Sequence, residues 1–399
     1  MMLSVEEIIE RVKTAGLREY GVYNECVAGK WEKILNEADP ADGDMAVAAG
    51  LNNNDTDKVL LALLKEDADK VITGMQMAAK VLGAKEMVLY IPEGEDELKA
   101  ALESKCADSD IALEEGIVNV RRFRGKAIHH IETLKALADI ADGSYEPGVL
   151  LAVKSGDTIG ELKKYPFGTK VADVVGDVAD VKAIMIGSKL YDTETACGIV
   201  IENDTAAGNG VITLIDKGAC MIDTAEKVLL KERQHGCGKC TFCREGIGQL
   251  HVMTKEITQG QGKASYLDMM DEIGDAMTFS TLCSVGQTGS DFTMASRKYF
   301  ANEYTDHIKK KKCTTGVCKS FMSIYIDPNA CTGCEECADV CPADAIEGKS
   351  GFIHMIDEFE CTKCGKCIAA CEEEAIIQTD GRLPKLPTRL TKVGKFKKR

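Results

Sequence analysis

The spacing of the cysteines constrains this chain more than any other feature. Two runs near the C-terminus repeat one pattern, C-x2-C-x2-C-x3-C. In this spacing three thiolates of a run bind one [4Fe–4S] cluster, and the fourth binds the cluster of the other run. The pattern therefore predicts two clusters with the following ligands: Cys331, Cys334, Cys337 and Cys371 for the first, and Cys361, Cys364, Cys367 and Cys341 for the second.

A third cysteine set lies upstream of these two runs. Cys237, Cys240 and Cys243 follow a C-x2-C-x2-C spacing at the start of a predicted helix, and Cys283 comes forty residues later. Four thiolates with one distant member suit a further [4Fe–4S] cluster, and helix N-termini add N–H donors that stabilise its negative charge. Zinc accepts the same ligands. The three-plus-one spacing favours the cluster.

Composition excludes several classes of protein. The net charge of −15 argues against nucleic-acid binding, because a phosphate backbone requires dense Lys and Arg. No run of eighteen apolar residues is present, so we expect no membrane span, and the acidic start does not resemble a signal peptide. The 18 cysteines are grouped as C-x2-C, which indicates metal binding in a reducing cytoplasm rather than disulfides.

Residue patterns predict an α/β and α+β multidomain protein. Residues 1–147 alternate helices (3–14, 70–82 and near 95–105) with strands (86–91 and 117–120), which indicates an α/β layer. Residues 148–215 contain short β-prone runs, one of them Lys170–Val175, and form a β-rich module. The rest divides into a helical bundle at 216–312, a ferredoxin-like domain at 313–380 and an extended basic tail at 381–399.

The cysteine segments also carry a family resemblance. C-G-K-C-T-F-C-R-E-G at 237–246, followed by T-L-C-S-V-G at 281–286, resembles the family of NADH-oxidising flavoprotein (51 kDa) subunits of complex I. The beta subunits of electron-bifurcating [FeFe] hydrogenases and of NAD-linked formate dehydrogenases are the most similar, since they also append a two-cluster ferredoxin. The resemblance covers residues 148–380 and implies that the β-rich module is a β-grasp domain of the soluble-ligand-binding (SLBB-like) type.

The N-terminal part departs from that family. The family binds FMN with a long glycine loop, whose bare backbone lets the cofactor phosphate approach. This chain has Val22 and Tyr23 where glycines are needed, and only the Gly-Lys-Trp ending survives, at 29–31. We therefore interpret residues 1–147 as a degenerate FMN/NADH domain that has lost its cofactor. A residual FMN site would use Lys30, Asn53 and Asp55.

Other residues have two interpretations each. By resemblance to the hydrogenase-type relatives, Cys313, Cys318 and His354 suggest a structural zinc whose fourth ligand is not evident; the alternative is two buried thiols and a surface histidine. The solitary cysteines, Cys220 among them, are interpreted as small buried hydrophobes. Residues 121–130 form a basic patch, R-R-F-R with His129 and His130, which we interpret as a solvated helix face; the alternative is an old nucleotide surface or a docking face.

These features predict an iron–sulfur electron-transfer subunit of a soluble, cytoplasmic, multi-subunit oxidoreductase, not catalytic alone. It would relay single electrons between a flavoprotein, NAD-linked or ferredoxin partner and a catalytic dehydrogenase or hydrogenase subunit. One alternative is an NADH:acceptor (ferredoxin) oxidoreductase with a remodelled FMN site; another is an assembly scaffold with structural clusters. The sequence does not give the substrate, the direction of flow, the stoichiometry or whether the complex bifurcates.

Overall fold

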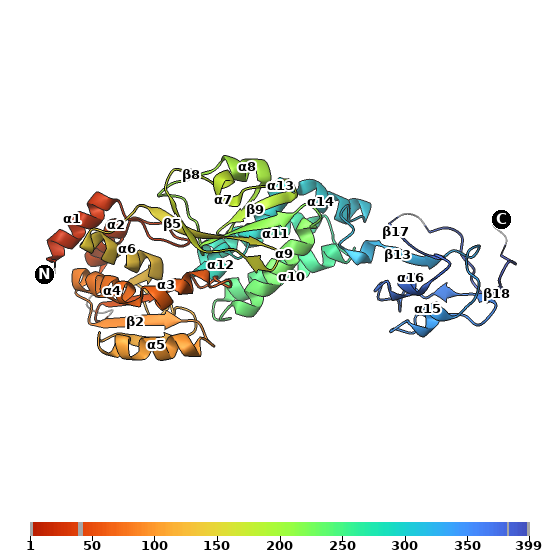
Figure 1. Ribbon diagram of the computed structural model, residues 1–399, viewed down its shortest axis with the longest axis horizontal. Helices are drawn as coiled ribbons and strands as arrows, with labels where there is room; N and C mark the ends of the chain where they lie inside the picture. The colour runs from red at the N-terminus through yellow and green to blue at the C-terminus, as the bar shows by residue number, and fades with distance from the viewer. Residues whose placement is uncertain (1–2, 39–42, 381–382, 397–399) are drawn as a thin grey trace. The chain divides into compact units, whose positions relative to one another are not determined.

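The computed structural model describes residues 3–38, 43–380 and 383–396 (Figure 1). The chain forms two compact units, each described separately. The first contains residues 1–219, 224–252 and 267–300, and the second contains residues 220–223, 253–266 and 301–399. None of the helices in the described ranges is long and apolar enough to cross a membrane.

The first unit begins with a parallel α/β layer. Its sheet has the order β3-β2-β1-β4, and every neighbouring pair is parallel. The chain passes from β1 to β2 and β3 on one side and returns to β4 on the other side of β1, so a topological switch point lies between β1 and β4. The elements are α1 (Val5–Ala15), α2 (Val27–Glu37), β1 (Ala46–Gly50), η2 (Val59–Leu61), α3 (Ala62–Glu66), α4 (Ala68–Leu82), β2 (Glu86–Ile91), α5 (Asp96–Ala107), β3 (Ala112–Glu115), β4 (Ala127–His130) and α6 (Ile131–Asp142).

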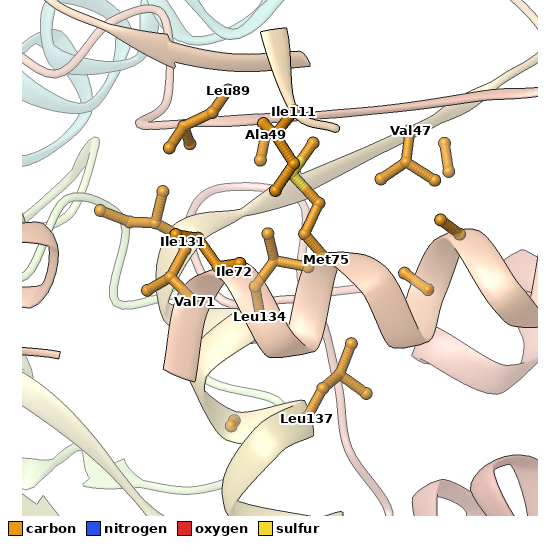
Figure 2. Packing of buried hydrophobic residues seen from close by; sticks show 14 of the residues in the cluster. Val47, Ala49, Val71, Ile72, Met75, Leu89, Ile111, Ile131, Leu134 and Leu137 are labelled. Carbon is orange, nitrogen blue, oxygen red and sulfur yellow. The ribbon is translucent and has the colours of Figure 1, made fainter. Parts of the chain in front are cut away.

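The two faces of this sheet are covered differently. Alternate strand residues such as Val47 and Leu89 pack against the helices, with Met75 of α4 and Leu134 of α6 in the same cluster (Figure 2). Helices α4 and α6 approach closely at Gly74, where an added Cβ would lie 1.8 Å from a backbone oxygen of α6. The other face carries a smaller cluster of Ala46, Ala48, Val88, Tyr90, Val118 and Phe123, so the β3–β4 connection covers it instead of a helix.

The sequence located most of these helices but misplaced one strand. Predicted helices 3–14 and 70–82 correspond to α1, with its Ser4–Glu7 capping box, and to α4, which ends at left-handed Gly83. The strand expected at 117–120 is wrong, because β3 occupies Ala112–Glu115. The backbone N–H and C=O of Val118 instead bond the Asn53 side chain at 2.8 and 2.9 Å, which takes the groups that a strand ladder needs.

The β-rich module follows in the same unit. Its sheet has the order β10-β9-β12-β5-β6, with β7 also paired to β5 and a separate β8–β11 pair. The strand expected at Lys170–Val175 is wrong beyond its first residue, because Val171–Val175 forms helix α7 and buries Val171 and Val174 in the module core. The elements are β5 (Gly148–Ser155), β6 (Thr158–Ile159), β7 (Lys163–Pro166), β8 (Thr169–Lys170), α7, β9 (Val181–Ile186), β10 (Lys189–Asp192), α8 (Thr193–Gly198), β11 (Val200–Ile201) and β12 (Val211–Asp216).

Helices dominate residues 221–310, as the sequence predicted. The elements are α9 (Met221–His235), α10 (Thr241–Thr258), α11 (Ser265–Ser280), α12 (Ser284–Thr288), α13 (Asp291–Tyr299), α14 (Ala301–Thr305) and the π-helix η3 (Asp306–Lys310). Helices α9, α10 and α11 each contain residues assigned to both units. The single helix expected at 292–308 is divided into α13, α14 and η3.

The ferredoxin-like domain lies entirely in the second unit. It contains η4 (Lys319–Phe321), β13 (Ser323–Ile326), α15 (Glu336–Asp339), β14 (Ile346–Glu347), β15 (Phe352–Ile353), β16 (Met355–Ile356), α16 (Lys366–Ala370), β17 (Ile376–Thr379) and β18 (Thr391–Lys392). Strands β13 and β17 pair antiparallel, and Cys331, Cys337 and Cys367 belong to the core between the repeats. Two parts of the tail contact this domain: β18 pairs with β15, and Phe396 packs against the core.

Candidate metal centres and the neighbouring cavity

The structure brings together the four bundle cysteines. Cys243 lies in the first turn of α10 and Cys283 is the N-cap of α12. Burial, together with the nearby Cys283, Cys240 and Cys237, raises the pKa of Cys243 to about 12. Four thiolates therefore cannot share this nest unless a cation compensates their charge, which is the condition that an iron–sulfur core meets.

Two side chains outside the cysteine set contact this nest. The Arg121 guanidinium donates to the Lys239 carbonyl at 3.1 Å and to the Cys240 sulfur at 3.6 Å. A hydrogen bond from the Asn53 side chain favours the thiolate of Cys283, although burial raises the pKa of that thiol. Donors to cluster sulfurs set the reduction potential, so both residues are candidates for tuning it.

The basic patch at 121–130 is thus not the solvated helix face that the sequence suggested. Residues 121–125 form turns, and each of the first two arginines has a defined partner. Arg121 bonds the cysteine loop, whereas Arg122 pairs with Glu86 and Glu114. His129 and His130 are buried at the end of β4.

In the ferredoxin-like domain the fourth cysteine of each run lies near cysteines of the other run. Burial raises the pKa of Cys337 to about 12, with further contributions from Cys331, Cys334 and Cys371. Around the other nest, Cys341 lines one small hollow together with Cys361, Cys364 and Cys367. Backbone N–H groups of Ala345 and Lys363 donate to the sulfurs of Cys341 and Cys361, both at 3.4 Å.

A fourth group of ligands is more compact than the three cysteine nests. Cys220, His307, Cys313 and Cys318 are all buried, and their ligand atoms lie within 4.8 Å of one another. No other group of this compactness occurs among the described residues. Close ligand atoms suit a single ion, whereas a cubane holds its thiolates farther apart. Three sulfurs and one imidazole form a Cys3His set, a ligand combination typical of structural zinc sites.

The histidine of this group is oriented toward the sulfurs. His307 Nδ1 lies 2.8 Å from the Glu303 carbonyl, which only accepts hydrogen bonds, so Nδ1 carries a proton. The other ring nitrogen, Nε2, lies 3.4 Å from Cys220 Sγ. Such a carbonyl partner is the usual device for orienting a metal-binding imidazole. The π-helix η3 that carries His307 is itself a geometry common at functional sites.

This arrangement changes the ligand set that the sequence suggested for zinc. Cys313 and Cys318 belong to the group, but His354 does not. His354 is not the surface residue of the alternative interpretation either, since it is 2% exposed with no partner for its ring nitrogens among the described residues. The missed ligands, Cys220 and His307, lie far from the C-x4-C pair in sequence, and only folding brings them to it.

A cavity lies beside the bundle nest in the first unit. It has a volume of about 310 Å³ and opens at the carboxyl ends of β1 and β4, where parallel sheets place their ligands. Residues 282–284, which include the cluster ligand Cys283, form part of its wall. The family resemblance led us to expect a residual FMN site in this domain, and the residues present test that expectation.

The residues proposed for a residual FMN site do not form a phosphate cradle. The Lys30 ammonium already bonds the Ile128 carbonyl at 2.6 Å and pairs with Glu19 and Glu25 at 3.5 and 3.1 Å. The Asn53 amide is occupied by Val118.

Asp55 and Gly21 are likewise occupied by contacts within the protein. Asp55 lies outside this cavity and accepts from the N–H groups of Asp57 and Lys58. The backbone of Gly21 is covered by Asn52, whose side-chain oxygen lies 2.7 Å from where a Cβ would be. FMN therefore finds neither bare backbone nor a free lysine at these positions.

Buried polar groups behind the cavity neutralise one another. Glu19 accepts from His129 Nδ1 at 2.9 Å and from the backbone N–H of His130 at 2.8 Å, and Trp31 donates its indole N–H to His129 Nε2 at 3.0 Å. Burial alone would raise the pKa of Glu19, but Lys30 and His129 lower it to about 2. Glu19 is therefore ionised at neutral pH, and its charge fixes the orientation of His129.

Comparisons with known proteins agree with this description. The NADH-ubiquinone oxidoreductase-F iron-sulfur binding region matches residues 223–307, and a 4Fe-4S dicluster domain matches residues 323–372. The NADP-reducing hydrogenase subunit HndC of Solidesulfovibrio fructosivorans is 26% identical over 422 aligned residues, which cover 87% of this chain and 85% of that protein. The mitochondrial NADH dehydrogenase [ubiquinone] flavoprotein 1 of Dictyostelium discoideum is 26% identical over 109 residues, or 27% of this chain and 23% of that one.

A solved structure shares the fold. A chain in the crystal structure of an NAD+-reducing [NiFe]-hydrogenase in the H2-reduced state aligns with a TM-score of 0.63 and 20% identity, covering 77% of this chain and 63% of its own length. This chain thus spans less than two thirds of that structure and of the Dictyostelium flavoprotein. The matches confirm the resemblance to the family of 51 kDa flavoprotein subunits, with a mixed α/β multidomain fold and [4Fe–4S]-binding regions.

Proposed function

We propose that this relative of the 51 kDa flavoprotein subunit is a cytoplasmic electron relay of a multi-subunit oxidoreductase and has lost its own flavin. Three [4Fe–4S] clusters would pass single electrons between a flavin-, NAD- or ferredoxin-linked partner and a catalytic dehydrogenase or hydrogenase subunit. The observation that carries the proposal is the presence of three cysteine nests, in two of which burial and the neighbouring cysteines raise the pKa of one thiol to about 12.

The proposed ligands are the four cysteines of each nest. The bundle cluster would use Cys237, Cys240, Cys243 and Cys283, and the ferredoxin clusters would exchange Cys341 and Cys371 between their runs. Zinc fits the compact group of Cys220, His307, Cys313 and Cys318, where it would have a structural role. When bound, each cubane supplies reversible one-electron transfer, whereas the protein supplies N–H donors, burial and charge.

The state of the cavity supports the proposed absence of flavin. Lys30, Asn53 and Asp55 have protein partners, and Asn52 covers Gly21. A flavin that splits a hydride into two electrons needs a phosphate cradle and room for a nicotinamide. At about 310 Å³ the cavity is at the low end of the range for ligand pockets, about 300 to 1,000 Å³, and does not provide for both.

The test is to measure cofactors in the anaerobically purified chain and then to add NADH. We expect about twelve iron atoms, four for each of three clusters, about one zinc and no flavin, with no bleaching by NADH. One flavin per chain that NADH bleaches would overturn the proposal and favour the NADH:acceptor alternative. Clusters that dithionite cannot reduce would favour the scaffold.

A further inference from the structure

One hydrogen-bond donor at the cavity has no acceptor. His130 ends β4, lines the cavity and is 5% exposed. Its Nδ1 accepts the backbone N–H of Glu132 at 3.3 Å, as the N-cap of α6. Burial lowers the pKa of His130 to about 4, so the ring is neutral and its single proton is on Nε2. That nitrogen is buried and has no partner among the described residues.

Such a donor requires an explanation. A buried N–H without an acceptor costs about 1–3 kcal/mol, and native proteins rarely keep one unless water or a ligand completes it. The neighbouring His129 shows the contrast, because both of its ring nitrogens are bonded, to Glu19 and to Trp31. Both histidines line the cavity, and only His130 keeps an unpaired ring nitrogen, which a ligand oxygen would satisfy.

The charges around the cavity favour an anion. Arg124 and Lys126 line it and form no ion pair within the described ranges, whereas Lys30 is paired with Glu19 and Glu25. Three cations against two carboxylates leave the lining at about +1, in a chain whose net charge is −15.

Much of the remaining wall is apolar, and the volume of the cavity limits the size of the ligand. Leu51, Val118, Phe123 and Leu282 contribute to it, and the volume is about 310 Å³. A small apolar body would be buried against these side chains while its charged end meets the donors. Pockets with mostly apolar walls and a few placed polar groups are typical of small-molecule sites.

We propose that this cavity binds a compact organic anion, whose carboxylate or phosphate accepts a hydrogen bond from His130 Nε2 and is neutralised by Arg124 and Lys126. The proposal rests on the absence of flavin proposed above, and not on the identity of the relay's partners. Because Cys283 forms part of the same wall, a bound anion would disfavour reduction of the bundle cluster and lower its potential.

The test uses three probes on the anaerobically purified chain: inorganic phosphate, benzoate and FMN. Binding would be followed by calorimetry, by the fluorescence of Trp31, which is the only tryptophan, and by the potential of the bundle cluster. His130→Asn keeps an acceptor that can cap α6 but removes the distal donor, so we expect about tenfold weaker binding. Arg124→Gln with Lys126→Gln should weaken binding severalfold and reduce its salt dependence.

Arg122→Gln is the matched control, since it removes one positive charge that pairs with Glu86 and Glu114 and does not line the cavity. Saturable binding of benzoate or phosphate that His130→Asn weakens and Arg122→Gln does not would support the site, and the preferred probe would identify the anion as carboxylate or phosphate. Absence of binding for both anions, or binding indifferent to His130→Asn, would overturn the inference and leave the relay intact. Stoichiometric FMN binding would overturn the proposed loss of flavin together with the inference.

Discussion

The ferredoxin-like domain and the N-terminal α/β layer both gather polar side chains around a candidate site, but they do so over different distances in sequence. In the ferredoxin-like domain every proposed cluster ligand comes from one of two runs of eleven residues, 331–341 and 361–371. The cavity at β1 and β4 instead combines residues near 20–30, 50–53, 118–130 and 282–284. The first kind of site depends on local spacing, whereas the second depends on the whole fold.

The largest expected effect comes from the one bundle ligand that is distant in sequence. Cys283→Ser should remove the bundle cluster, so that iron falls by about a third while the ferredoxin clusters stay. Iron analysis and electron paramagnetic resonance of the reduced protein would measure the loss. Cys197→Ser, at a half-buried cysteine outside every proposed ligand set, is the control and should keep the full iron content. Full iron in the Cys283→Ser protein would mean that the distant thiol is not a ligand.

The proposed zinc site lies between the two kinds of site, because its ligands combine a local pair with two residues that are distant in sequence. His307→Ala should lose the metal and lower the thermal midpoint, since structural zinc contributes directly to folding free energy. His354→Ala should keep about one zinc per chain, because His354 lies outside the compact group. The measurement is zinc content with iron as the internal standard. Retention in the first variant and loss in the second would restore the ligand set suggested by sequence.

The N-terminal layer should show a pH dependence of its own. Burial raises the pKa of Glu132 to about 8, although its carboxylate accepts the Leu150 N–H at 3.1 Å. The folded state therefore holds a proton that the unfolded state releases near 4.5, and stability falls as pH rises towards 8. The slope is about 1.4 kcal/mol per pH unit for this group.

Glu132→Gln carries no such proton, so its thermal midpoint should fall less than that of the unaltered protein between pH 5 and pH 8. The comparison of the two proteins at each pH removes the contribution of other groups. Parallel pH profiles would show that Glu132 titrates normally in the folded protein.

The smallest expected effect concerns Arg121. Its guanidinium donates to the Cys240 sulfur, so Arg121→Gln should lower the reduction potential of the bundle cluster. A hydrogen bond of about 1 kcal/mol corresponds to ~40 mV for one electron. Spectroscopic redox titration would detect the shift, and the ferredoxin clusters in the same sample are the internal control. An unchanged potential would assign Arg121 a purely structural role at the Lys239 carbonyl.

The same contrast explains what the sequence could predict. The cluster ligands of the ferredoxin runs could be predicted without knowledge of the fold, since their spacing alone specifies which thiols can surround a cubane. Cys220 could not be recognised as a candidate ligand, because no local pattern links it to His307 or to the C-x4-C pair. The strand expected at 117–120 failed for a related reason, since the side chain of Asn53, distant in sequence, took the hydrogen bonds of Val118.

The cavity could likewise be predicted only in part from the sequence. The sequence indicated that Val22 and Tyr23 disrupt a glycine loop, and Tyr23 does line the cavity. It did not indicate that Asn52 covers Gly21 or that Glu19 holds Lys30 and His129. Those contacts depend on the register of β1 with β4, which places Gly50 beside His130.

The exchange of Cys341 and Cys371 between the two runs has a consequence for biosynthesis. Chains emerge from the ribosome from the N-terminus, at about 5–20 residues per second. With the proposed ligand sets, the first run cannot complete its coordination until residue 371 has been made. The second run needs only Cys341, which has been made before it. Both cubanes would therefore be inserted into the finished pair of runs. A chain truncated between 341 and 367 would lack a complete ligand set for either cluster. Cluster delivery to this domain is thereby coupled to completion of its synthesis.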